Sequence, residues 1–145
     1  MSTNRLLHIF VLAALFIGSS LPAMGKKPVL KNSIWKAVQK EFVADAGTMT
    51  ITHTLEFTSA KDVLVKEETH MPSHPAMYMN PDGTVDRIPG WSSENSQAGT
   101  YTFRRGILTV TLEDGSRKDY TFRDNGTFTR EEPWGAVLEF LCQPR

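Results

Sequence analysis

Histidine and methionine gather in one segment of this 145-residue chain. The ten residues from His70 to Met79 include two histidines and three methionines, and copper accepts imidazole and thioether ligands. Pro72 and Pro75 exclude a helix here, so the chain does not present His70 and His74 together on one helix face. Methionines that fill gaps or line an adaptable contact surface are the simpler interpretation. Copper handling is therefore the third of our hypotheses. Its candidate ligands are His70 and His74, and no other metal site and no cofactor are predicted.

A third histidine, His53, stands between Ile51 and Leu55 on the apolar face of an alternating segment. A neutral imidazole in such a place is costly unless it has a hydrogen-bond partner. If this face lines a barrel, His53 is a polar group inside an otherwise apolar ligand pocket. A core histidine bonded to a neighbour is the alternative. No recognisable serine or cysteine nucleophile accompanies His53, so an enzyme is not predicted.

Aromatic residues supply the remaining candidate contacts. Trp91 lies in the polar segment from Gly90 to Ala98, which we expect to be an exposed loop, and an aromatic side chain there marks a contact surface or a lid. Tyr78 and its neighbours are expected to share that surface, whereas inward-facing aromatic residues serve a ligand or pack the core. The candidate ligand-binding residues are His53, Met77, Tyr78, Met79, Trp91, Tyr101 and Phe103.

Strands must position these residues, because no segment shows the period of a helix longer than one turn. Apolar residues and His53 occupy every second position from Met49 to Phe57, with threonine or Glu56 between them, which is typical of a half-buried strand. The segment 40–47 is predicted as a turn or a single helical turn. Further strands are predicted at residues 33–39, 63–69 and 136–142, and a small hairpin at 76–80 and 84–88.

The stretch from Gly99 to Arg130 predicts four short strands joined by tight turns. Its three turns each contain a glycine that can adopt positive φ, at Arg105-Gly106, Asp114-Gly115 and Asn125-Gly126. Hairpins in series make an antiparallel meander, and closure removes the exposed edges of a flat sheet. The predicted fold class is therefore all-β, an up-and-down meander closed into a small barrel of about eight to ten strands.

Three local patterns occur together in this chain. They are an early strand with a tryptophan, Ser33-Ile34-Trp35-Lys36, the turn Asn80-Pro81-Asp82-Gly83, and the paired segments 99–103 and 108–112. With these patterns the chain resembles the lipocalin-like β-barrel domains that bacteria export, of the Bacteroidetes type. The resemblance implies a calycin-type barrel over residues 26–145.

The first 25 residues are predicted to be a signal peptide. Arg5 provides a positive charge, Leu6 to Ile17 is almost wholly apolar, and small residues precede a cleavage site after Gly25. The apolar run is shorter than the roughly 20 residues that span a bilayer, and no later segment resembles a membrane span. We therefore expect an exported protein, periplasmic or extracellular, with one domain at residues 26–145.

The charge balance argues against nucleic acid as a partner. Without Arg5, 15 of the 16 Lys and Arg residues remain, against 16 Asp and Glu residues, and nucleic-acid binding requires clustered basic residues. The single cysteine, Cys142, allows no disulfide within the chain and is expected to be buried and unreactive.

Two binding functions compete ahead of copper handling. The preferred hypothesis is an exported, non-catalytic protein that holds a small apolar or amphipathic ligand inside the barrel. The alternative is a barrel with a solid core that binds a protein or a glycan through the surface of residues 70–98.

Overall fold

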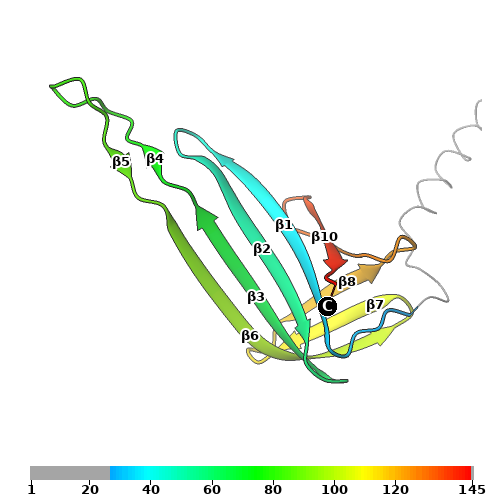
Figure 1. Ribbon diagram of the computed structural model, residues 1–145. Helices are drawn as coiled ribbons and strands as arrows, with labels where there is room; N and C mark the ends of the chain where they lie inside the picture. Colours follow the sequence, from blue (N-terminus) through cyan, green and yellow to red (C-terminus); the bar gives the residue numbers. More distant parts are fainter. Residues whose placement is uncertain (1–26, 145) are drawn as a thin grey trace, which may run out of the picture.

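The structure is a computed structural model that describes residues 27–144. The predicted signal peptide, residues 1–25, lies outside the described residues. Eight antiparallel strands close into a barrel in the order β1-β10-β9-β8-β7-β6-β3-β2, and two short strands pair separately (Figure 1). The strands are β1 (Ser33–Val43), β2 (Gly47–Phe57), β3 (Asp62–Met71), β4 (His74–Pro75), β5 (Arg87–Ile88), β6 (Trp91–Arg104), β7 (Ile107–Leu112), β8 (Arg117–Phe122), β9 (Phe128–Glu131) and β10 (Val137–Cys142).

This architecture confirms the predicted all-β, up-and-down barrel. No residue from 27 to 144 lies in a helix, and within that range there is accordingly no helix able to cross a membrane. The four predicted strands of the 99–130 stretch are the end of β6 together with β7, β8 and β9. Arg105 and Gly106 adopt φ values of 51° and 78° between β6 and β7, as a tight hairpin turn requires.

The strands differ in length, and this difference shapes the molecule. β1, β2, β3 and β6 contain 11, 11, 10 and 14 residues, whereas β7, β8, β9 and β10 contain 6, 6, 4 and 6. The long strands therefore continue as a curved sheet past the short ones (Figure 1). At the far end of this sheet, the β4–β5 hairpin projects from β3 and β6. We call residues 72–90 the arm.

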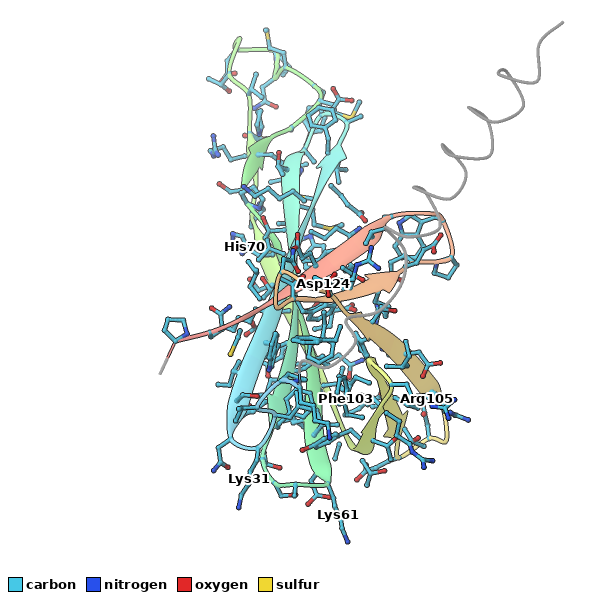
Figure 2. All side chains as sticks on the ribbon, turned by 90° about the vertical axis from the view of Figure 1, so that its right-hand side faces the viewer. Lys31, Lys61, His70, Phe103, Arg105 and Asp124 are labelled. Atoms are coloured by element: carbon cyan, nitrogen blue, oxygen red, sulfur yellow. The ribbon has the colours of Figure 1, made fainter. Side chains whose placement is uncertain are left out.

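Aromatic rings fill one end of the barrel, the end opposite to the arm. In Figure 2 the labels of Lys31, Lys61 and Arg105 mark this end. Trp35 packs edge-to-face on Phe128, with ring centroids 4.8 Å apart, and the Phe128 ring lies 5.1 Å from that of Phe122. The Trp35 indole donates a hydrogen bond to Ser33 Oγ, 2.9 Å away, so its polar atom is satisfied inside the core. The fully buried side chains are Leu55, Phe57, Val63, Leu108, Val110, Tyr120, Phe128 and Phe140.

Two predictions on the long strands are wrong. The segment from Gly90 to Ala98 is not a loop, because β6 begins at Trp91, which pairs with Met71 of β3. The first strand also continues beyond residue 39 to Val43, and only residues 44–46 form the turn. Both errors have one cause. These strand segments extend past the short strands, so few of their side chains are buried and the apolar alternation of a half-buried strand is weak or absent.

The prediction for Cys142 is also wrong, because its side chain is exposed. Cys142 is the last residue of β10 and pairs with Trp35 of β1. It shares the alternation of Leu138 and Phe140, which are buried. Alternation thus indicates the face on which a residue lies, but not whether other elements cover that face at the end of a strand.

The aromatic core can be tested by truncating Phe128. Phe128→Ala should lower the free energy of unfolding by about 3–5 kcal/mol, because it removes a fully buried ring that contacts Trp35 and Phe122. Chemical denaturation of the purified protein measures this. The matched control is Phe42→Ala on the outer face of β1, where the side chain is 80% exposed and the change should stay within about 0.5 kcal/mol. Equal losses in the two variants would contradict the described packing.

Candidate functional site

The structure separates the sequence-predicted site residues into three places. His53 lies inside the barrel, in the middle of β2, near the level at which the short strands end and the long strands continue. Tyr101 and Phe103 lie in the aromatic core. Met77, Tyr78 and Met79 lie on the arm, and Trp91 lies at its base, at the start of β6.

The two predicted contacts on β6 serve packing. Tyr101 packs edge-to-face on Phe57, with centroids 4.7 Å apart, and its hydroxyl donates to Ser59 O at 2.9 Å. Phe103 packs edge-to-face on Phe122 and Phe128, at 6.1 and 6.2 Å. Neither residue lines the cavity next to His53.

His53 lies in the middle of β2, opposite Ala37 of β1 and Glu67 of β3. Its side chain is 12% exposed, and its Nδ1 lies 3.4 Å from Glu67 Oε2. The other ring nitrogen, Nε2, is buried and has no hydrogen-bond partner among the described residues. Burial lowers the pKa of His53, and the neighbouring Glu67 carboxylate partly opposes that effect.

A small cavity of about 40 Å³ adjoins His53, and we call it the polar pocket. Charged and amide side chains line much of its wall, in contrast to the apolar pocket expected from the sequence. Glu67, Asn95 and Gln97 come from β3 and β6, and Lys118, Tyr120 and Arg130 come from β8 and β9. Since the Glu67 side chain is 52% exposed, the pocket reaches solvent on that side.

Arg130 is the best-satisfied charge of the pocket. Its Nε donates to Glu132 Oε1 at 3.0 Å and its Nη1 donates to Tyr120 Oη at 3.3 Å, while the guanidinium lies 5.5 Å from the centroid of the Tyr120 ring. Burial lowers the pKa of Arg130, but the hydrogen bonds to Glu132 and Tyr120 outweigh burial and raise it. Burial also raises the pKa of the Tyr120 hydroxyl, which therefore keeps its proton at neutral pH.

Lys118 is compensated less well. It lies opposite Val110 of β7, on the inward face that Tyr120 and Phe122 share. Among the described residues, no carboxylate oxygen lies within 4.0 Å of its ammonium group and no hydrogen bond reaches it. Burial and the nearby Arg130 lower the pKa of Lys118. Its carboxylate neighbours, with Glu67 the first among them, act on the ammonium only from beyond direct contact.

The size of the polar pocket bears on the preferred ligand hypothesis. Drug-sized ligands occupy pockets of about 300–1,000 Å³, whereas about 40 Å³ holds a few water molecules or a group the size of a carboxylate. The cavity that His53 lines therefore does not match a small apolar molecule. An apolar ligand in the barrel stays a prediction. The geometry favours small polar ligands in the polar pocket and a contact through the arm.

The arm presents large apolar side chains to solvent on an ordered backbone. Met77, Tyr78 and Met79 are 80%, 65% and 68% exposed. The turn beside them is held by Asn80 and Thr84, whose backbones are joined by a hydrogen bond of 2.7 Å between Asn80 N and Thr84 O. At the base, Arg87 donates to Ser73 O and to Ser73 Oγ, both at 2.9 Å.

The two candidate copper ligands lie on different sheets, His70 on β3 of the barrel and His74 on β4 of the arm. His70 Nδ1 lies 2.9 Å from Ser92 Oγ, and His74 Nδ1 lies 3.2 Å from Pro72 O. In the part of the chain that the structure describes, no three His, Cys, Asp or Glu side chains are placed to hold a metal ion. Copper handling stays an untested hypothesis.

Sequence patterns did not identify three residues in or beside the polar pocket, namely Lys118, Arg130 and Glu132. The signal was present, because Lys118 alternates with Tyr120 and Arg130 alternates with Phe128 on strands whose inward faces are aromatic. Glu132, the residue after β9, is buried against Arg130. A charged residue two positions from a core aromatic residue on the same strand thus lies on the inward face, and this spacing predicts a polar group in the barrel interior.

No family model, no curated protein and no solved structure matches this chain. The closed eight-stranded antiparallel barrel is compatible with a lipocalin-like fold. Any statement on function therefore depends on the geometry and chemistry of the chain itself.

The buried histidine predicts a pH effect on stability. Because burial lowers the pKa of His53, the unfolded chain takes up this proton at a higher pH than the folded protein does. The stability that His53 contributes is therefore complete above its ordinary pKa of about 6.5 and is lost as the pH falls through the lower folded pKa. Between about pH 7.5 and pH 5, the melting temperature of the wild type should fall more steeply than that of His53→Gln.

The exposed His70 provides the control for this experiment. His70→Gln should keep the steep pH dependence of the wild type, because the imidazole of His70 lies on the outer face of the barrel. Equal pH dependence in the wild type and His53→Gln would show that His53 is not buried as described.

Proposed function

We propose that this domain is a non-catalytic interaction module that binds a protein partner through the arm. The observation that carries the proposal is the exposure of Met77, Tyr78 and Met79 on an ordered projection. Tyrosine and methionine are enriched in the cores of protein interfaces, where a few large side chains provide most of the binding energy.

The ordered tip favours binding, because little conformational entropy remains to be lost. The Asn80 side chain donates to Thr84 Oγ1 at 3.0 Å and to Asp86 Oδ1 at 3.1 Å, and Thr84 N donates to Asp82 Oδ1 at 2.9 Å. Gly83 completes the turn with a φ of 83°. This network holds the turn from Asn80 to Asp86, which directly follows the three exposed side chains.

The apolar side chains of the arm do not serve the barrel. A two-stranded hairpin has little core of its own, and the regular β4–β5 ladder has only two residue pairs, His74 with Ile88 and Pro75 with Arg87. Trp91, Ile88 and Val85, nearer the base of the arm, are exposed as well, at 49%, 43% and 43%. An exposed apolar surface of this kind is typical of a contact with another protein.

A protein fits this surface better than a glycan does. Its side chains are mainly thioether, aliphatic and aromatic, and flexible methionines adapt to irregular protein surfaces. The small volume of the polar pocket argues against the barrel interior as the site for a large ligand.

Export and family membership belong to the same proposal. We take residues 1–25 to direct export to the periplasm or the cell exterior, where the arm would meet its partner. The apolar leader supports export. The meander order of the barrel supports the assignment of residues 26–145 to the lipocalin-like domains.

The arm is tested by a triple substitution, Met77→Ser, Tyr78→Ser and Met79→Ser. The triple variant should bind the partner at least about tenfold more weakly, because it removes three exposed contact side chains from a surface that does not stabilise the barrel. Pull-down from the native source identifies the partner, and calorimetry with the purified partner measures the dissociation constant.

The matched control is Val38→Ser with Phe42→Ser on β1, where both side chains are similarly exposed but lie off the arm. The control should bind within about twofold of the wild type. A partner that binds the triple variant and the wild type equally would exclude the arm as the site, and capture of a glycan instead of a protein would refute the proposed partner class.

A further inference from the structure

His53 Nε2 is the buried side-chain nitrogen that has no hydrogen-bond partner among the described residues. The half-buried Lys118 side chain lines the same pocket from the opposite side of the barrel. His53 Nε2 comes from β2 and the Lys118 ammonium comes from β8. Both residues line the polar pocket. A buried polar group without a hydrogen bond destabilises the folded state, and such groups in native proteins are rare enough to call for a specific explanation.

The charges around the pocket show which kind of group is missing. Glu132 compensates Arg130 through two hydrogen bonds. Glu67 lies next to His53 Nδ1, on the solvent-exposed side, where water screens its charge. The Lys118 ammonium has no carboxylate oxygen within 4.0 Å among the described residues, and the Glu67 and Glu132 carboxylates act on it only from a greater distance. When the His53 ring is protonated, Nε2–H and the Lys118 ammonium are both donors, and they suit a hydrogen-bond acceptor with negative charge.

The volume sets the size of that partner. A cavity of about 40 Å³ is close to the space of a single carboxylate group with little attached to it. Two residues with side-chain amides, Asn95 and Gln97, and two with aromatic rings, Tyr120 and Phe140, also line this cavity. The amides can bond to any polar substituent beside the carboxylate, whereas a long apolar chain finds no space.

We propose that the polar pocket binds the carboxylate of a small organic acid, with the Lys118 ammonium and His53 Nε2–H as its donors. Arg130 stays bound to Glu132 and Tyr120 and contributes positive potential. This site is separate from the arm and does not depend on the partner proposed for it.

Binding is coupled to protonation of His53. The Glu67 carboxylate lies 3.4 Å from Nδ1, and both ring nitrogens are donors when the ring is protonated. The charged groups that act on His53 are Glu67 of β3, Arg130 and Glu132 at β9, and Lys118 of β8. Ala37 of β1 and Phe140 of β10 are uncharged neighbours. A bound carboxylate adds negative charge to this set, and acid conditions consequently favour its binding.

The probe that tests the site is acetate, with acetamide as its neutral isostere and methylammonium as a cation of similar size. Titration of purified wild-type protein, followed by the NMR signals of the His53 ring, should give a saturable shift with acetate only. The dissociation constant for acetate should fall by up to about tenfold for each pH unit between about pH 7.5 and 6.5. These measurements need no variant, so they do not depend on whether a substitution folds.

Lys118→Met tests the second donor. The substitution keeps much of the length of the side chain but removes its charge, and acetate should bind at least about tenfold more weakly. Lys36→Met on the outer face of β1 is the matched control and should bind acetate like the wild type. A saturable shift with methylammonium or acetamide would overturn the proposal. So would no saturable shift with acetate, or equal affinity in Lys118→Met and the wild type.

Discussion

The unequal length of the strands is the constraint on which the rest of the structure depends. Four long strands and four short strands can close a barrel only over the length of the short ones. Within that length, aromatic side chains such as Trp35 and Phe128 meet across the interior and exclude water. Beyond it, the long strands have no facing partner, and they become an open curved sheet that carries the arm (Figure 1). The ladder between β1 and β10, which closes the barrel, is short: Trp35 pairs with Cys142 and Lys36 pairs with Leu141.

The polar pocket lies at the boundary between the closed, water-free barrel and the open curved sheet. Deeper in the barrel, burial is complete and the interior residues are apolar, as at Leu108 and Val110. Further out, water solvates charged groups at little cost. At the boundary, Lys118 and Arg130 can reach inward from short strands while Glu67 still contacts solvent. Partial burial in this zone lowers the pKa values of His53 and Lys118.

Sequence patterns predicted the elements whose faces are unequally buried. The alternation through Leu55 and Phe57 and the turn at Arg105-Gly106 placed β2 and the β6–β7 hairpin correctly, because one face of each strand meets the core. The same reasoning failed for Trp91, since the start of β6 is solvated on both faces and carries serine, glutamate and asparagine. It failed differently for Lys118 and Arg130. Their positions alternate with core aromatic residues, but a charged side chain in that phase was not expected to lie inside.

The sequence alone determined the fold class and the inward face of each core strand, because period-two alternation and glycine turns act locally. It also placed His53 on the inner face of its strand. Only the tertiary structure decided what covers that face, since coverage depends on where strands distant in sequence begin and end. That is why Tyr101 is a packing residue, Cys142 is exposed, and Lys118 from β8 shares a pocket with His53 from β2. Burial, and with it pKa and ligand size, is a property of neighbours that local sequence patterns do not specify.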